Sequence, residues 1–404
     1  MATTSSAFEV RRARSNRAGS TTLHLGHPVV LLTMTIVALL VVGVVMILSA
    51  SSVQSFASYG SSFVFFKKQL FSIGLGLAAF ALFYRVDYRR WNGLGYLMLP
   101  AVAALLLVVL IPSIGVTVGG SQRWIPLGFT DFQPSEVAKF ALVLFAADVF
   151  SRKDESTFCH FSHTAVPMLP AFGVLAALIM MQPDLGTTML LAFIAMGLLF
   201  VAGAPFRHIV PIGLVGAGLS VLAGLAAPYR RERIMAFMDP WADPLESGYH
   251  AIQSMIALGS GGFFGVGLGA SRQKWSYIPN AHTDFIYAII GEELGFLGTL
   301  VVLGLFLFLA YMGIRTARKA PDRFGLLVAS GITIWIALQA LVNIGAVTSS
   351  LPITGVPLPL VSFGGTSLVI SLAAMGVLLN IAKQGEDGPP PRRRKRRRGP
   401  ARAR

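Results

Sequence analysis

Charged residues are scarce in this sequence of 404 residues, and their scarcity excludes an ordinary soluble protein. Only 13% of the residues are charged, whereas soluble domains carry about 25%. Apolar residues make up 54% of the chain, and a membrane-spanning helix needs roughly 20 residues in a mostly apolar run. The composition therefore predicts a membrane protein with on the order of ten spanning helices.

Cysteine and internal repetition are also lacking. Cys159 is the only cysteine in the sequence, which excludes an internal disulfide framework and a metal site built from several cysteines. No convincing internal repeat is visible, so the sequence gives little support for a transporter built from inverted repeats. We expect no dedicated metal site.

Apolar runs predict an all-α polytopic membrane protein. The run from Pro28 to Ala50 is long enough to cross a bilayer and lacks a convincing small-residue cleavage site, so we interpret it as a spanning helix that is retained. Ten spans are expected, near 28–50, 67–85, 94–112, 135–151, 165–181, 185–203, 208–227, 285–314, 324–347 and 363–382. They form one transmembrane domain, 28–383, between basic tails at 1–27 and 384–404.

Lysine and arginine are distributed unevenly between the two sides of this predicted bundle. With both termini placed in the cytoplasm, 24 of the 33 basic residues lie on the cytoplasmic side and eight lie on the outer side. The excess of positive charge on cytoplasmic segments supports this orientation. The net charge of +15 is then mostly a consequence of topology, and we expect the tail at 384–404 to lie near anionic lipid and not to bind nucleic acid.

One long segment, 228–284, separates the seventh and eighth predicted spans and lies on the outer side. Loops longer than about 15 residues are usually functional or disordered, and the aromatic residues of this loop indicate that it is ordered. Its glycine runs at 259–262 and 265–269 superficially resemble nucleotide-binding loops. No preceding strand or downstream acid supports that reading, so we interpret them as tight turns.

Charged residues within or beside the spans are candidate functional residues, because charge is costly inside a membrane. Glu136 and Lys139 lie three apart near the start of the fourth span and can form an ion pair, which is either structural or functional. Asp184 lies in the first turn of the sixth span, where the helix dipole favours an acid. Arg123 lies at the outer interface, where it either snorkels beside an aromatic ring or holds a phosphate.

Asp284 lies where the long outer loop re-enters the membrane at the start of the eighth span. That position is accessible to solvent, and its surroundings are apolar enough to shift the pKa of the carboxyl. A helix cap is an alternative role for Asp284. Charges of both signs and aromatic rings gather on the same side. Such a surface suits an amphipathic substrate with a charged head and sugar rings.

The motifs of the chain, in combination, resemble those of the SEDS (shape, elongation, division and sporulation) family, whose members include FtsW and RodA. The resemblance covers about residues 28–383. It rests on GGSQRWIPLG, FQPSEVAK, QPDLGT, YRRERI, DPWADP, the run IPNAHTDFIYAIIGEELGFLG and the run NIGAVTSSLPITGVPLPLVSFGGTS. The chain departs from the common pattern at Asn280, Ala270 and His250.

The resemblance implies a ten-helix glycosyltransferase that polymerises lipid II into peptidoglycan at the outer face of the bacterial cytoplasmic membrane. Asp284 matches the essential acid of the family and would act as the general base. Outer cations would stabilise the departing pyrophosphate. The residues expected to bind substrate are Arg123, Glu136, Lys139, Asp184, Arg230, Arg233, Gln253, Gln273, Lys274, His282, Thr283 and Ser362. No cofactor is certain, although a divalent cation, Mg²⁺ or Mn²⁺, could assist the pyrophosphate.

The resemblance also implies partners: lipid II, the lipid-linked nascent glycan, a class B penicillin-binding protein and other divisome proteins. The basic tails and the SASSVQSF segment followed by FFKKQL favour the division branch, FtsW, over the elongation branch, RodA. Two other functions stay open, a lipid II flippase and a non-catalytic scaffold for the transpeptidase. A flippase needs a polar path that reaches both faces, whereas the motif residues gather on the outer side.

Overall fold

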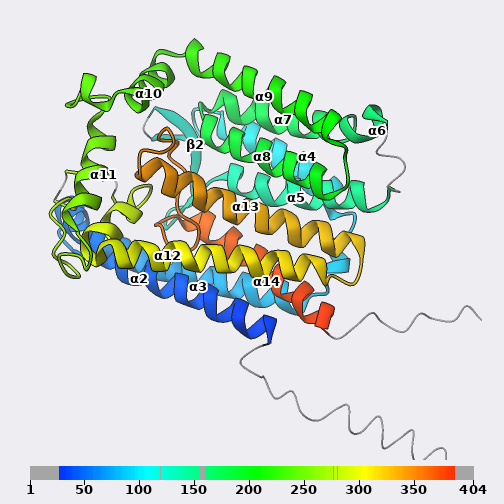
Figure 1. Cartoon of the computed structure of the whole chain (residues 1–404), viewed down its shortest axis with the longest axis horizontal. Coiled ribbons are helices and arrows are strands. Elements are labelled where there is room, and N and C mark those ends of the chain that lie inside the picture. The colour runs from blue at the N-terminus through cyan, green and yellow to red at the C-terminus, as the bar shows by residue number, and fades with distance from the viewer. Residues whose placement is uncertain (1–26, 119, 154–159, 276, 280, 387–404) are drawn as a thin grey trace, which may run out of the picture.

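The fold is a bundle of helices that run along the long axis of the molecule (Figure 1). The structure is a computed structural model, and it describes residues 27–118, 120–153, 160–275, 277–279 and 281–386. Ten helices correspond to the ten expected spans: α2 (Pro28–Tyr59), α3 (Val64–Arg85), α4 (Leu94–Val109), α5 (Pro134–Ser151), α7 (Met168–Met181), α8 (Leu185–Val201), α9 (Phe206–Ala226), α12 (Ile286–Arg318), α13 (Arg323–Val347) and α14 (Gly365–Glu386). The chain is therefore a polytopic membrane protein.

The lengths of these helices vary, and so does their polarity. Six of them, α2, α3, α9, α12, α13 and α14, are long and apolar enough to cross a membrane, and α4, α7 and α8 are shorter apolar helices. Helix α5 begins with Pro134 at its first position, where the missing N–H costs nothing. It carries Glu136, Lys139 and Asp148, which are all buried. Buried charged residues therefore lie inside α5, and α12 also carries two, Glu292 and Glu293.

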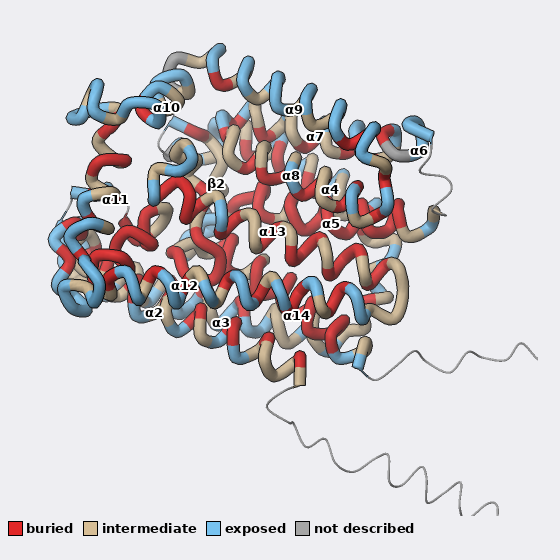
Figure 2. The backbone as a smooth tube through the Cα atoms, in the orientation of Figure 1, coloured by how far each residue is buried: buried red, intermediate tan, exposed pale blue. Residues whose placement is uncertain are grey.

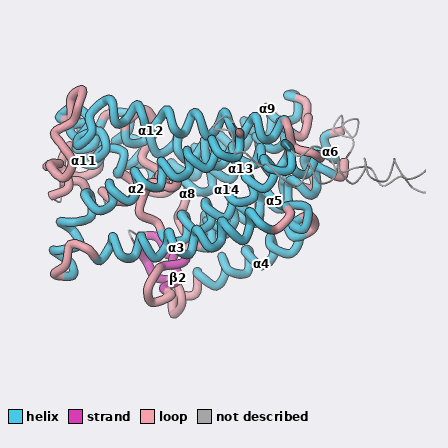
Figure 3. Tube along the Cα trace, turned by 90° about the horizontal axis from the view of Figure 1, so that it is seen from below, coloured by secondary structure: helices cyan, strands magenta, loops and turns pink. Residues whose placement is uncertain are grey.

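Short elements complete the bundle. The expected all-α fold is confirmed with one addition, a small antiparallel sheet of β1 (Val116–Val118), β2 (Ser121–Pro126) and β3 (Asp131–Phe132) in the order β1-β2-β3. Figure 3 shows this sheet at one margin of the bundle. The long segment 228–284 is ordered into α10 (Pro228–Met238), the 3-10 helix η3 (Pro240–Ala242) and α11 (Tyr249–Ser260). The short helix α6 (Phe161–Ala165) lies at the end of the bundle opposite α10 and α11 (Figure 1). The 3-10 helix η1 (Tyr88–Trp91) lies beside Asn380 and Asp322.

The core lies along α5, α13 and α14, where most residues are buried, whereas α9 is largely exposed (Figure 2). The exposed side chains of α9 are apolar, for example Leu214, Leu219 and Leu222. Such a surface fits a lipid environment, which makes no demand for polar side chains. We name the two ends of the bundle from Figure 1. The site end carries α10, α11 and residues 348–364, and the tail end is where α2 begins and α14 ends.

Helix α12 is broken near the site end at Gly295, which has φ 69° and ψ −167°. Four main-chain hydrogen bonds link the two sides of the break to the neighbouring glycine-rich loop. After the break, Phe296 donates to the carbonyl of Gly262 at 2.9 Å and Leu297 to that of Phe263 at 3.2 Å. Before the break, the carbonyl of Glu292 accepts from Val266 at 2.9 Å and that of Glu293 from Gly267 at 3.1 Å. The glycines permit this close approach, since a Cβ on Gly265 would lie 2.1 Å from the Glu293 carbonyl oxygen. The glycine runs therefore form a wedge that supports α12.

A polar cluster closes the tail end. Asn380 of α14 accepts from the backbone N–H of Tyr88 at 3.1 Å and from Gln384 Nε2 at 3.0 Å, and its Nδ2 donates to the carbonyl of Tyr84 at 2.7 Å. The Tyr88 hydroxyl donates to Asp322 at 2.7 Å. Both ends of the Asn380 amide are paired, so this cluster links α3, α13 and α14 through satisfied hydrogen bonds.

Candidate functional site

Asp284 lies at the site end in the turn that precedes α12, and its side chain is half-buried. The N-cap residue of α12 is Phe285 and no side chain caps the helix, so the helix-cap alternative for Asp284 is wrong. The pKa of Asp284 is raised above its usual value, mainly by burial. The negative charge of Asp184 adds to this rise, and the positive charges of Arg123 and Arg233 oppose it. The charges of these three residues therefore influence the carboxylate electrostatically.

The segment that follows α13 encloses the turn of Asp284. Ser362 Oγ donates to the carbonyl of Thr283 at 2.6 Å, and the N–H of Phe363 donates to the carbonyl of His282 at 2.9 Å. Gly355, at φ 72°, lies against the carboxylate, because a Cβ at that position would be 3.4 Å from Asp284 Oδ2. A glycine here leaves space beside the acid that any side chain would occupy.

Two amides of α13 hold these segments from the inside of the bundle. Asn343 Nδ2 donates to the carbonyls of Asp284 and Val356, both at 2.8 Å. Gln339 Nε2, one turn away, donates to the carbonyl of Pro357 at 3.0 Å. Both side chains are buried. They connect the transmembrane core to the turn that carries the acid.

The expected ion pair between Glu136 and Lys139 is confirmed, with Lys139 Nζ 2.8 Å from Glu136 Oε1 and both side chains buried. Lys139 Nζ also donates to Gln339 Oε1 at 2.8 Å, and Trp335 Nε1 donates to the same oxygen at 2.8 Å. Glu136 Oε2 has no hydrogen-bond partner among the described atoms. The ion pair therefore holds Gln339, and Gln339 in turn donates to the segment that encloses Asp284.

Arg123 of β2 and Asp184 form a second ion pair, 3.1 Å between Arg123 Nη1 and Asp184 Oδ2. Asp184 is the N-cap of α8 and not a residue of its first turn, since it accepts from the N–H of Thr187 at 3.0 Å. Thr187 Oγ1 donates to the other carboxylate oxygen at 2.9 Å. Asp184 therefore caps α8 and also pairs with Arg123, and its role in binding substrate stays a prediction. Arg123 Nε has no hydrogen-bond partner among the described atoms.

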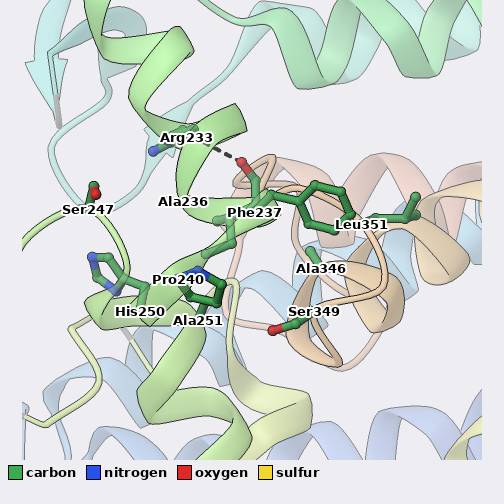
Figure 4. A pocket seen from close by; sticks show the side chains of 11 residues that line it. Arg233, Ala236, Phe237, Pro240, Ser247, His250, Ala251, Ala346, Ser349 and Leu351 are labelled. Carbon is green, nitrogen blue, oxygen red and sulfur yellow. Dashed lines mark hydrogen bonds between the residues drawn. The ribbon is translucent and has the colours of Figure 1, made fainter. Parts of the chain in front are cut away.

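Arg233 of α10 reaches across to the segment after α13, where its Nη1 donates to the carbonyl of Ile353 at 3.4 Å. A pocket lies between α10, α11 and this segment (Figure 4), and it is lined by Arg233, Ala236, Phe237, Pro240, Ser247, His250, Ala251, Ala346, Ser349, Leu351 and Ile353. His250 stacks on Phe285, the neighbour of Asp284, with ring centroids 5.6 Å apart. The pocket therefore carries a cation and contacts, through His250, the residue that follows Asp284, although Asp284 itself is not among the lining residues.

Two further predicted residues lie in this region. His282 is buried and its ring lies beside Phe65 and Phe363, with centroids 4.7 and 5.4 Å away. Burial lowers the pKa of His282 to about 4, so this side chain is neutral and does not supply a cation near pH 7. Gln253 is half-buried on α11, the helix that carries His250.

Three predicted substrate-binding residues have other partners. Lys274 is buried, with Nζ 3.5 Å from Glu293 Oε1, and the N–H of Gln273 donates to Glu292 at 3.3 Å. Arg230 donates to the carbonyl of Ala223 at 3.1 Å, near the end of α9. Lys274 is thus ion-paired, as Arg123 is with Asp184, and its role in binding substrate stays a prediction.

The sequence reasoning missed Asn343, Gln339 and Gly355 as site residues. Gln339 and Asn343 are polar residues four apart in an otherwise apolar span, a pattern that could have identified them. The position of Gly355 beside Asp284 depends on how the segment after α13 folds back, and no local pattern predicts that.

The described residues do not form a dedicated metal site. No group of three or more His, Cys, Asp or Glu among them could hold a metal ion. Asp184, the acid whose charge acts on Asp284, already uses both of its carboxylate oxygens on Arg123 and Thr187. A divalent cation that assists the substrate pyrophosphate stays a prediction.

Taken together, the helices and the polar groups at one end define a membrane protein with a candidate site around an acid at the site end of the bundle. The chain belongs to the FtsW/RodA/SpoVE family of cell cycle proteins, whose model matches residues 30–387. Stage V sporulation protein E of Bacillus subtilis is 44% identical over 356 residues, which cover 88% of this chain and 97% of that protein. The probable peptidoglycan glycosyltransferase FtsW of Thioalkalivibrio sulfidiphilus is 43% identical over 363 residues, which cover 89% of this chain and 90% of that protein.

Solved structures agree with this assignment. A chain of a peptidoglycan synthase complex that coordinates polymerization and crosslinking matches with a TM-score of 0.72 and 31% identity, covering 87% of this chain and 97% of that chain. The rod shape determining protein RodA of Thermus thermophilus matches with a TM-score of 0.64 and 29% identity, covering 87% of this chain and 96% of that chain. The family indicated by the sequence motifs is confirmed.

Proposed function

We propose that this protein is a peptidoglycan glycosyltransferase that polymerises lipid II into glycan strands, with Asp284 as the general base. The observation that carries the proposal is the surroundings of Asp284. A half-buried acid lies at the membrane boundary, enclosed by the segment after α13 and close to Arg123 and Arg233. Relatives named as probable peptidoglycan glycosyltransferases support the reaction class.

The reaction joins an acceptor sugar hydroxyl to the anomeric carbon of the donor. A carbon–oxygen bond forms as the bond to the lipid pyrophosphate breaks, and Asp284 takes the proton of the hydroxyl. Its raised pKa makes it a better proton acceptor than an ordinary aspartate. Arg123 and Arg233 would stabilise the negative charge that develops on the pyrophosphate. A single displacement inverts the anomeric centre, so Asp284 acts as a base and not as a nucleophile.

The proposal extends to place and partner. The site end would face the outside of the bacterial cytoplasmic membrane, with both termini in the cytoplasm, as the distribution of basic residues favours. A class B penicillin-binding protein would cross-link the product, and the branch favoured by the tails is septal synthesis. The likeness to a chain of a peptidoglycan synthase complex supports a partner of this kind.

The test is polymerisation of lipid II by the purified full chain together with its transpeptidase partner. We expect Asp284→Asn to lose about 10²- to 10⁴-fold in rate, the usual contribution of a positioned base. Asp87→Asn is the control, because Asp87 is a partly exposed acid that caps η1 at the tail end. Equal product from Asp284→Asn and wild type would overturn the role of Asp284. Transport of labelled lipid II without polymerisation would instead favour a flippase.

A further inference from the structure

Asn343 is a buried amide in the middle of the contacts that hold Asp284. It is 2% exposed, and its Nδ2 donates to two carbonyls at once, those of Asp284 and Val356. Val356 follows Gly355, which lies against the Asp284 carboxylate. One amide therefore joins the backbone of the acid to the segment that faces the carboxylate of the same acid.

Gln339 extends this contact toward the core. It lies four residues before Asn343, hence on the same face of α13, and it donates to the carbonyl of Pro357. Its Oε1 accepts from Lys139 and Trp335. The two amides thus present donors to consecutive carbonyls of one segment, and the buried ion pair of α5 keeps Gln339 in place.

Asn343 uses only the nitrogen of its side-chain amide for hydrogen bonds. Asn343 Oδ1 is buried without a hydrogen-bond partner among the described atoms, and most buried polar atoms are paired. The orientation of the amide is determined by its two acceptors, because only Nδ2 can donate to carbonyl oxygens. Local exceptions of this kind are expected at functional sites.

We propose that Asn343 is a positioning residue for Asp284, and that Gln339 supports the same segment. The inference rests on the proposed function, because it concerns the acid assigned there as the base. A hydrogen bond to the Asp284 carbonyl restricts the backbone of the turn and therefore the direction of the carboxylate. A misplacement of about 1 Å can lower a rate by about 10²-fold, so the effect should appear in kcat.

The experiment compares two buried asparagines in the full chain with its partner. Asn343→Leu removes both donor bonds at similar volume, and Asn380→Leu removes a buried amide of the same kind at the tail end. We expect Asn343→Leu to lower kcat by about 10²-fold while KM changes by less than about 3-fold, the pattern of a lost transition-state contribution. Asn343→Ser, which keeps one donor, should fall in between. Asn380→Leu should lower the melting temperature and keep kcat per folded molecule.

A second readout separates positioning from general damage. A carboxylate released from its place is better hydrated, so the acidic limb of the kcat profile should move to lower pH in Asn343→Leu and stay in Asn380→Leu. If Asn343→Leu does not fold, Asn343→Ser and Gln339→Glu decide the matter. Gln339→Glu keeps the acceptor for Lys139 and Trp335 and loses the donor to Pro357, so we expect a lower kcat.

Unchanged kcat in the folded Asn343 and Gln339 variants would overturn the inference, as would equal losses of kcat in Asn343→Leu and Asn380→Leu. These results differ from a failure of the proposed function. If wild type makes no glycan, or Asp284→Asn is fully active, then the proposed function itself fails. If wild type is active, Asp284→Asn is inactive and Asn343→Leu is fully active, only the positioning role fails.

Discussion

The two ends of the bundle use buried polar groups differently. At the tail end, Asn380 pairs both its oxygen and its nitrogen, and it links helices that need no further partner. At the site end, Asn343 pairs only its nitrogen, and Glu136 and Arg123 each keep a buried atom without a hydrogen-bond partner among the described atoms. A satisfied network stabilises one arrangement. The tail end also has buried atoms without a described partner, Trp91 Nε1 and Asp148 Oδ2, so the contrast is between the two asparagines: the amide of Asn380 is fully paired, whereas that of Asn343, beside the acid, is not.

The largest effect on stability should come from the buried ion pair of α5. Lys139→Met leaves Glu136 buried without its cation, and removal of one partner of a buried pair costs about 3–5 kcal/mol. Thermal or denaturant unfolding of the detergent-solubilised chain measures the loss. The double variant with Glu136→Leu should recover part of it, because no uncompensated charge is left.

The tail end offers the matched control for this pair. Lys319 and Glu386 form an ion pair at 2.9 Å whose side chains are 48% and 26% exposed. Exposed pairs contribute about 0–1 kcal/mol, so Lys319→Met should be nearly silent. Similar losses for Lys139→Met and Lys319→Met would contradict the contrast drawn between the two ends.

A smaller effect is expected for two glycines in the left-handed region. Gly355 lies beside the Asp284 carboxylate at φ 72°, whereas Gly93 at the tail end has φ 86°, and a Cβ added there would meet no atom within 4 Å. Alanine at either position should lower stability by roughly 1–2 kcal/mol, the cost of this backbone conformation for a residue with a Cβ. Unfolding experiments on both variants measure this shared cost.

Only the site-end glycine should also affect the reaction. The methyl group of Gly355→Ala would contact Asp284 Oδ2 at 3.4 Å, where it would displace water or substrate from the acid. We expect a fall in lipid II polymerisation for Gly355→Ala and none for Gly93→Ala once the folded fractions are equal. Equal activities would show that the space beside Asp284 is not used.

Local patterns in the sequence predicted the helices well, because long apolar runs in a membrane have few alternatives. They also predicted the Glu136–Lys139 pair, since a spacing of three places both side chains on one face of a helix. The break in α12 was missed. The break at Gly295 depends on main-chain hydrogen bonds to residues 262–267, which are distant in sequence, and the predicted span was drawn as one continuous helix.

The candidate site was predicted only in part, for a related reason. Asp284, Arg123 and Arg233 could be named from their charge and their place on the outer side. Lys274 was named on the same grounds, but the sequence did not predict its ion pair with Glu293, nor that of Arg123 with Asp184. Which charges remain available depends on pairings between segments far apart in sequence, and a single sequence does not contain that information.

The smallest expected effect is a shift of a pH midpoint. Burial raises the pKa of Asp284 from its ordinary value of 3.8, and the base must be deprotonated to accept a proton. Activity should therefore fall with decreasing pH through that raised pKa, at a higher pH than an ordinary aspartate would give. A rate profile measured at saturating lipid II tests this, and an acidic limb at or below 3.8 would contradict it.

The contribution of Asp284 to stability should change with pH in the opposite direction to activity. Because the folded-state pKa of Asp284 lies above the unfolded value, the folded state binds the proton more tightly, and this group adds stability as pH falls from above the folded pKa to below 3.8. Asp284→Asn removes that dependence, so the difference in melting temperature between variant and wild type should favour the variant at neutral pH and shrink on acidification. Asp322→Asn at the tail end, where the acid accepts hydrogen bonds from Tyr88 and Arg89, should destabilise at neutral pH. If wild type is instead more stable than Asp284→Asn at neutral pH, then the Asp284 carboxylate stabilises the fold, as Asp322 does, and the prediction is wrong.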